Sequence, residues 1–312
     1  MQGIVERAAA VNSPRHLWRC TQTIYAHNSW IRSIVADQNG QYIISGSGDR
    51  TVKLWHLHNG QLHQTLQGHS GWVRALALSP DNAMVASGSN DNSICLWRLG
   101  ETQNMTTLHG HQASVRAVAF SPDGQWLYSG SQDRTVRRWS VATGALHKTL
   151  LTHQHWIRTL ALSPDGRTLV TSTQDKEINI CDALTGQVRR SVQRHTGDIV
   201  SLAISPDGEL LVSGGADHKV MFWRLRDGRF MAELDAHGGG INSVSFSADG
   251  KLLATASRDR TIRIWNMTTS KLLDVLQGHE SGVWSAVFAP DSRTLISGDW
   301  TGHIRCWQLA LP

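Results

Sequence analysis

The sequence predicts an all-β fold built from seven repeated four-stranded units. Three observations support this prediction. A histidine recurs every 42 residues, other polar and aromatic residues recur at the same step, and each repeat contains four short strand-like segments separated by turns. At 312 residues the chain could form two average domains or one large all-β domain. A repeat that covers nearly the whole chain favours one domain.

Four columns of residues define the repeat. The histidine column is complete: His27, His69, His111, His153, His195, His237 and His279. The hydroxyl column is also complete: Ser45, Ser87, Ser129, Thr171, Ser213, Thr255 and Ser297. The tryptophan column has Cys181 in the fourth repeat, and its other members are Trp55, Trp97, Trp139, Trp223, Trp265 and Trp307. The aspartate column has Thr301 in the seventh repeat, and its other members are Asp49, Asp91, Asp133, Asp175, Asp217 and Asp259.

Each repeat is predicted to contain four strands. In residues 69–108, "WVRALALS" is apolar enough for an inner strand, "AMVASGS" is the second strand and "SICLWRL" the third, and the fourth ends near Leu108. The turn after the first strand is "SPDG" at 121–124, 163–166 and 205–208. Such units cannot bury both faces alone, so they must stack on one another.

The Gly-His pair, the hydroxyl, the turn Asp and the Trp resemble the WD40-repeat family, over about residues 18–309. The family's Trp-Asp pair is mostly incomplete, because the Trp is followed by His56, Arg98, Ser140, Arg224, Asn266 and Gln308, while Asp182 follows Cys181. The resemblance implies a seven-bladed β-propeller of four-stranded antiparallel blades, formed as a single domain by residues 18–312.

The N-terminal stretch "WRCTQTI" (18–24) aligns with "GQLHQTL" (60–66), which is a fourth strand. The last repeat stops without its own fourth strand, so residues 18–24 are expected to complete the last blade and close the ring. Residues 1–17 have no counterpart in the repeat and are expected to be an N-terminal arm or linker.

The resemblance implies that the four columns form buried chains of hydrogen bonds. Five sets are complete: His27, Ser45, Asp49 and Trp55; His69, Ser87, Asp91 and Trp97; His111, Ser129, Asp133 and Trp139; His195, Ser213, Asp217 and Trp223; His237, Thr255, Asp259 and Trp265. The fourth repeat lacks the Trp, and the seventh is expected to lack the Asp. A catalytic nucleophile would occur once rather than seven times, so we expect braces and no catalytic residue.

Composition and cysteine spacing limit the remaining chemistry. The four cysteines have no zinc-site spacing, and no metal site or cofactor motif is predicted. Cys20 and Cys306 should lie on neighbouring strands at the closing seam, as two buried thiols rather than a disulfide. No signal peptide or membrane span is found, so a soluble, cytoplasmic protein is expected. The formal net charge of +5 is a mild bias towards acidic partners.

In propellers of the family that this chain resembles, partners usually bind the face formed by the Gly-His loops and the turns between second and third strands. The position five after the His supplies Arg32, Arg74, Arg116, Arg158 and, in the seventh repeat, Trp284; the position three after it supplies Trp30, Trp72 and Trp156. The position directly after the aspartate column supplies Arg50, Arg134, Lys176 and Arg260. The position directly before that column supplies Arg258 in the sixth repeat and Trp300 in the seventh. Tryptophan and arginine dominate binding hot spots, so these residues are the predicted partner-binding face.

Three functions remain open at this point. The favoured one is a non-catalytic interaction scaffold or complex subunit, whose face binds an acidic or phosphorylated segment of a protein partner. The alternative is a propeller that binds single-stranded nucleic acid, through phosphate contacts and base stacking. An enzyme with a site in the channel is a remote third. Against a binding face, the arginines could be duplicated surface residues, each paired with an acidic neighbour.

Overall fold

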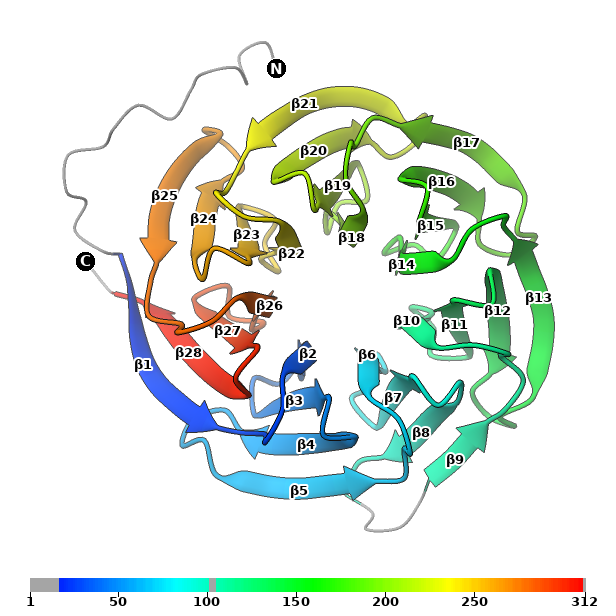
Figure 1. Cartoon of the computed structure of the whole chain (residues 1–312), viewed down its shortest axis with the longest axis horizontal. Helices are drawn as coiled ribbons and strands as arrows, with labels where there is room; N and C mark the ends of the chain where they lie inside the picture. The colour runs from blue at the N-terminus through cyan, green and yellow to red at the C-terminus, as the bar shows by residue number, and fades with distance from the viewer. Residues whose placement is uncertain (1–16, 101–104, 311–312) are drawn as a thin grey trace.

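Each repeat folds into four short antiparallel strands of four to eight residues, because turn residues interrupt the chain at that spacing. The structure is a computed structural model in which residues 17–100 and 105–310 are described. Seven four-stranded sheets stand around a central axis as the blades of a propeller, as Figure 1 shows. The predicted fold class is therefore confirmed.

The strands are numbered along the chain. The inner strands are β2 (Ile31–Ala36), β6 (Val73–Leu78), β10 (Val115–Phe120), β14 (Ile157–Leu162), β18 (Ile199–Ile204), β22 (Ile241–Phe246) and β26 (Val283–Phe288). The second strands are β3 (Tyr42–Ser47), β7 (Met84–Ser89), β11 (Trp126–Ser131), β15 (Thr168–Thr173), β19 (Leu210–Gly215), β23 (Leu252–Ser257) and β27 (Thr294–Asp299).

The two outer layers complete the blades. The third strands are β4 (Thr51–His56), β8 (Ile94–Arg98), β12 (Thr135–Ser140), β16 (Glu177–Asp182), β20 (Lys219–Arg224), β24 (Ile262–Asn266) and β28 (His303–Leu309). The outermost strands are β5 (Leu62–Gln67), β9 (Met105–Leu108), β13 (Leu146–Thr152), β17 (Val188–Gln193), β21 (Arg229–Asp235), β25 (Lys271–Leu276) and β1 (Trp18–Tyr25). We number the blades 1 to 7 from the one that begins with β2.

Blade 7 is built from both ends of the repeat array. Its sheet has the order β1-β28-β27-β26, and β1 pairs antiparallel with β28 from Trp18 opposite Leu309 to Tyr25 opposite His303. Closure by the stretch 18–24 is therefore confirmed. The predicted arm, residues 1–17, lies outside the described residues except for Leu17.

The seam holds two of the cysteines on neighbouring strands, as expected. Gln22 lies opposite Cys306, and Cys20 lies opposite Trp307, with a bulge between Cys20 and Gln22. Both cysteines are free thiols. Cys306 is buried, and burial raises its pKa to about 12. The expectation that both thiols are buried is wrong for Cys20, which is exposed on the edge strand beside a bulge.

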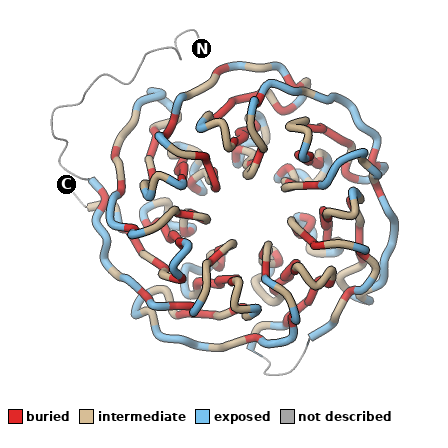
Figure 2. The backbone as a smooth tube through the Cα atoms, viewed as in Figure 1, coloured by how far each residue is buried: buried red, intermediate tan, exposed pale blue. Residues whose placement is uncertain are grey.

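The hydrophobic core lies between adjacent blades. The cluster between blades 1 and 2, for example, joins Ile44 and Leu54 of one blade to Val73 and Leu76 of the next. The blades approach so closely that a Cβ added at Gly46 would lie 2.7 Å from Val73 Cγ1. Figure 2 shows exposed residues following the outermost strands. No helix in residues 17–100 and 105–310 is long and apolar enough to cross a membrane.

Candidate functional site

One side of the ring, which we call the top face, carries two loops from every blade. One loop precedes the inner strand, and the other is the turn between the second and third strands. A backbone hydrogen bond joins them within a blade: Gly48 N–H donates to Trp30 O at 2.9 Å, and Trp300 N–H donates to Gly282 O at 3.1 Å. Side chains from both loops are therefore presented together.

Hydrogen-bonded sets of Trp, hydroxyl, His and Asp hold these loops in place. In blade 1, Trp55 Nε1–H donates to Ser45 Oγ at 3.0 Å, and this oxygen lies 2.7 Å from His27 Nε2. His27 Nδ1 lies 2.8 Å from the Asp49 carboxylate. Because the indole N–H only donates, the hydroxyl donates to Nε2 and Nδ1–H donates to Asp49. Blades 2, 3, 5 and 6 make the same contacts.

The charge states of the network members differ between blades. Burial alone would lower the pKa of His69 in blade 2, but hydrogen bonds with Asp91 and Cys95 outweigh it and raise this pKa to about 9. Blade 1 behaves differently. Burial lowers the pKa of His27 despite its bond to Asp49, so the imidazole is neutral near neutral pH. Burial alone would raise the pKa of Asp49, but hydrogen bonds from His27 and Thr51 outweigh it and lower this pKa well below its ordinary value. The carboxylate is therefore ionised and fully used as an acceptor. This histidine acts as a loop brace rather than as a base for chemistry.

Blade 7 also has a complete network, so the expectation that it lacks the aspartate is wrong. Asp299 accepts from His279 Nδ1–H at 2.7 Å, and Trp307 Nε1–H donates to Ser297 Oγ at 2.8 Å. Asp299 stands two residues before the aspartate column, at the end of β27, and its carboxylate still reaches the histidine. Thr301, which occupies the column, donates its hydroxyl to Asp299 at 2.7 Å.

Blade 4 is the one blade whose network is broken. Cys181 replaces the tryptophan, and burial raises its pKa to about 12. His153 Nε2 and Thr171 Oγ1 are buried without a hydrogen-bond partner among the described residues. Asp175 accepts from Thr173 Oγ1 at 2.5 Å rather than from His153. The loop before β14 is therefore less firmly held than its six counterparts.

A β-bulge recurs at the start of every inner strand. The pairing of β2 with β3 skips Arg32, and the pairing of β6 with β7 skips Arg74. The same shift occurs in the other five inner pairs, at Arg116, Arg158, Val200, Asn242 and Trp284. A bulge leaves its residue out of the ladder and redirects its side chain. This geometry explains why one sequence column supplies residues to a common surface.

Four tryptophans from blades 2, 1 and 7 form a continuous row, which we call the aromatic ladder. Trp72 packs edge-on against Trp30 with ring centroids 5.5 Å apart, and Trp30 stacks on Trp300 at 5.8 Å. Trp300 in turn contacts Trp284 at 5.6 Å. Trp72 and Trp300 are 46% and 50% exposed, so the ladder presents large aromatic surfaces to solvent.

Arg74 is held rigidly at one end of the ladder. Its guanidinium carbon lies 4.9 Å from the ring centroids of both Trp30 and Trp72. Its Nε–H donates to Asn90 Oδ1 at 2.8 Å, and Ser114 donates to the same oxygen at 2.7 Å. Cation–π contacts and a side-chain amide therefore orient the guanidinium without neutralising it.

Arg32 and Arg258 flank the other end of the ladder, with guanidinium carbons 4.8 and 5.8 Å from the Trp284 ring. The pKa of Arg32 is lowered to about 9, first by burial and then by the charges of Arg116, Arg74, Arg158 and Arg258. Arg32 still carries its charge near neutral pH. The structure therefore brings these arginines together as one cluster of positive charge around the axis.

Acidic neighbours neutralise little of this cluster. Arg158 forms an ion pair with Asp198 of blade 5. Among the described residues, Arg32, Arg74 and Arg116 form no ion pair. The alternative that duplicated arginines are each paired with an acidic residue therefore holds for Arg158 and fails for the other three.

The remaining predicted face residues lie apart from the ladder. Arg50, Arg134, Lys176 and Arg260 stand at the tips of the turns between second and third strands, with φ between 71 and 73°. A non-glycine residue in this left-handed region is uncommon, and the tight turn requires it. These four side chains form an outer set of positive charges on the top face.

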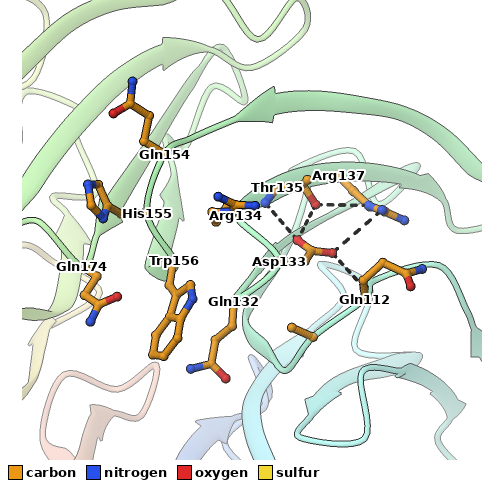
Figure 3. A pocket seen from close by; sticks show the side chains of 11 residues that line it. Gln112, Gln132, Asp133, Arg134, Thr135, Arg137, Gln154, His155, Trp156 and Gln174 are labelled. Carbon is orange, nitrogen blue, oxygen red and sulfur yellow. Dashed lines mark hydrogen bonds and ion pairs between the residues drawn. The ribbon is translucent and has the colours of Figure 1, made fainter.

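Trp156 is also separate from the ladder and lines a pocket between blades 3 and 4. The cavity measures about 570 Å³ and is lined by Gln112, Ala113, Gln132, Asp133, Arg134, Thr135, Arg137, Gln154, His155, Trp156 and Gln174. Figure 3 shows Trp156 between Gln132 and Gln174 in this view, with Arg134 and the Asp133 hydrogen bonds beside them. The pocket adjoins the loop of blade 4 that lacks its brace.

The opposite face differs in charge. Its turns carry Asp81, Asp123, Asp165, Asp207, Asp249 and Asp291. Hydrogen bonds from the Ser79 hydroxyl and the Ala83 N–H, at 2.5 and 2.9 Å, lower the pKa of Asp81. These carboxylates are therefore ionised, and they accept hydrogen bonds from residues of the turns in which they lie. No three His, Cys, Asp or Glu residues in the described part of the chain could hold a metal ion.

Several residues of the face were missed by the sequence reasoning. Asn90 orients Arg74, Asp198 pairs with Arg158, and Asp299 completes blade 7. The four glutamines of the pocket were also missed. The sequence does contain a signal for these glutamines. Only in the third and fourth repeats is the column histidine followed by a glutamine, and only there is the aspartate column preceded by one.

Comparison with known families matches nearly the whole chain to repeat propellers. A family described as "WDR36/Utp21 second beta-propeller domain" matches residues 11–177, more than half of the chain. The "WD domain, G-beta repeat" family matches residues 186–224, 228–266 and 270–308.

Three curated proteins match short stretches of the chain. The "Pre-mRNA-splicing factor prp46" of Aspergillus fumigatus is 32% identical over 65 residues, which cover 20% of this chain and 14% of that protein. The human "Pleiotropic regulator 1" is 38% identical over 45 residues, 14% of this chain and 9% of that protein. The "Nuclear distribution protein PAC1" of Candida albicans is 52% identical over 31 residues, 10% of this chain and 6% of that protein. The matched stretches thus span less than a sixth of each relative.

Proposed function

The chain belongs to the WD40-repeat family of β-propellers, and on that premise we propose that it is a non-catalytic scaffold whose top face binds an acidic or phosphorylated segment of a protein partner. The aromatic ladder with its unneutralised arginines is the observation that carries this proposal. The short match to a pre-mRNA-splicing factor supports a role as a subunit of a larger assembly. The cytoplasmic location expected from the sequence stays a prediction.

The ladder offers two complementary kinds of contact. The exposed rings of Trp72 and Trp300 provide apolar and aromatic surface for an anchor side chain of the partner. The guanidinium of Arg74, already fixed by two indoles and Asn90, can form a bidentate contact with a carboxylate or phosphate. Because these side chains are oriented before binding, little conformational entropy is lost when the partner binds.

Affinity capture from an extract of the source cells, followed by mass spectrometry, tests this proposal. The test variant combines Trp72→Ala with Arg74→Glu, which removes one end of the ladder and reverses its charge. We expect the wild type to retain a partner with an acidic segment, and the variant to bind a synthetic peptide of that segment at least about 10-fold more weakly.

The matched control is Arg167→Glu, which makes the same change of charge at an exposed position on the opposite face. All variants must first show the same thermal unfolding midpoint as the wild type. Equal retention of the partner by the ladder variant, or equal loss in both variants, would contradict binding at the ladder.

A further inference from the structure

The pocket between blades 3 and 4 differs from the rest of the top face in its chemistry. Of its eleven lining residues, Ala113 and Trp156 are apolar, and the others are polar or charged. Four are glutamines, from two sequence columns that hold no glutamine in the other five repeats. They are therefore not residues copied through the whole array of repeats. These carboxamides are particular to this one junction between blades.

Most of the amide groups are unused by the protein. Gln112 Nε2–H donates to Gly110 O at 2.9 Å, whereas Gln132, Gln154 and Gln174 make no side-chain hydrogen bond with the described residues. Each free carboxamide offers a donor and an acceptor in one plane. The pocket therefore suits a planar ligand whose edge carries both donors and acceptors.

Trp156 adds a stacking surface to these amides. Its side chain is 42% exposed and makes no ring contact with the aromatic ladder. Although the histidine network of blade 4 is broken, Gln174 N–H donates to Trp156 O at 2.9 Å. The backbone of Trp156 is therefore held beside the pocket while part of its ring remains exposed for stacking.

We propose that this pocket binds an adenine base of a single-stranded nucleic acid, with Trp156 stacked on the base and a glutamine carboxamide paired with its edge. Glutamine forms a bidentate pair with adenine N6 and N7, and unpaired bases stack on exposed aromatic side chains. An apolar peptide anchor would leave the side-chain amides of Gln132, Gln154 and Gln174 without hydrogen-bond partners, whereas a base edge can pair with them. Its volume of about 570 Å³ lies within the range of small-ligand sites.

Positive side chains are placed to hold the phosphates of such a strand. Arg134 is exposed at the rim of the pocket, and Arg116, which forms no ion pair with the described residues, lies on the inner strand of blade 3. Burial and then repulsion from Arg74 and Arg158 lower the pKa of Arg116 to about 10, which leaves it charged near neutral pH. Phosphates leaving the pocket towards the axis would meet this charge.

Fluorescence anisotropy with a labelled oligoadenylate RNA of about 12 nucleotides tests the proposal, since such a strand spans one site of this kind. We expect the full chain to bind oligoadenylate more tightly than oligouridylate, and to bind a duplex or free AMP weakly. Trp156→Ala should weaken binding roughly 10-fold, and a Gln132→Ala, Gln174→Ala variant should abolish the preference for adenine. Arg134→Gln should reduce the slope of log affinity against log salt by about 0.7.

Trp72→Ala is the matched control, because Trp72 occupies the same sequence column as Trp156 and is exposed to a similar extent. It should leave RNA binding unchanged and weaken the protein partner, whereas Trp156→Ala should do the reverse. Failure of this inference is thus distinguishable from failure of the proposed scaffold function. Equal effects of the two substitutions on RNA, no preference for single strands, or binding of an acidic peptide alone would overturn the proposal.

Discussion

At the scale of single residues, the hydrogen-bond networks show how polar side chains become structural. In the six complete networks the buried imidazole uses both nitrogens, as His27 does, and the carboxylate accepts several hydrogen bonds, as Asp49 does. A buried donor left without a partner costs about 1–3 kcal/mol, so such a network stabilises the fold when it is complete and weakens it when one member is missing.

Removal of Asp299 provides a direct test of the network in blade 7. Asp299→Ala leaves His279 Nδ1–H buried without an acceptor, and we expect it to lower the free energy of unfolding by about 1–3 kcal/mol. Asp175→Ala is the control, because its blade has no such bond to the histidine, and it should cost less than about 1 kcal/mol. Chemical denaturation measures both, and equal losses would contradict the assignment of Asp299.

The buried histidine of blade 7 predicts a dependence on pH. Burial lowers the pKa of His279, so the folded chain resists protonation there while the unfolded chain takes up a proton below about pH 6.5. The stability that His279 contributes is therefore complete above pH 6.5 and is lost as the pH falls through the folded pKa. The difference in unfolding free energy between wild type and His279→Gln should narrow from pH 7.5 to pH 5. A difference that widens would contradict a lowered pKa.

How much of the site could be predicted depends on whether a residue keeps to its column. Arg32, Arg74 and Trp30 occupy their repeat columns, so their position on the top face could be predicted from the sequence. Asp299 lies outside its column by two residues, yet its carboxylate reaches the same imidazole from the turn. A search for residues at a fixed spacing cannot find such a replacement. Contacts between blades, such as Arg158 with Asp198, depend on ring geometry that no single repeat contains.

At the scale of elements, each repeat combines regular strands with two local irregularities. The bulge at the start of the inner strand redirects one side chain, and the turn before the third strand holds one residue at positive φ. The strands were predictable from alternation and turn residues, and their observed bounds in blade 2 agree within about two residues with those expected. The bulges were not predictable, because a bulge is a shift in the pairing of two strands and no residue type in the sequence marks it.

The positive-φ turn residue limits which side chains are tolerated there. Arg260 has φ of 72°, and the equivalent position in blade 7 is Gly302. Arg260→Val places a β-branched side chain in this region and should lower the free energy of unfolding by about 1–3 kcal/mol. Arg260→Gly removes the same arginine without that strain and should be far less damaging. Denaturation curves distinguish them, and equal losses would mean that the arginine side chain rather than the backbone matters.

At the scale of the whole molecule, stability depends on closing the ring. Trp18 is 3% exposed, packs beside Phe288 with ring centroids 5.9 Å apart, and donates its backbone N–H to Asp274 at 2.9 Å. One strand therefore links the first described residues to blades 6 and 7. Closure was predictable because the repeat array begins with a fourth strand and ends with a third.

Substitution of Trp18 tests the strength of this closure. Trp18→Ala removes the largest side chain that β1 inserts between blades 6 and 7, and should cost about 3–5 kcal/mol. Arg19→Ala, on the exposed side of the same strand, should change stability by no more than about 0.5 kcal/mol. Thermal unfolding measures both. A small effect of Trp18→Ala would mean that the ring is held without its first strand.

The shared blade also has a consequence during synthesis. Trp18 is translated well before its partner Leu309, which follows 291 residues later in the chain. At about 5–20 residues per second, β1 leaves the ribosome roughly 15–60 s before β28 can pair with it. Throughout that interval β1 is unpaired and the growing propeller has an open edge. An incomplete ring is therefore exposed to chaperones and proteases until β28 has been made.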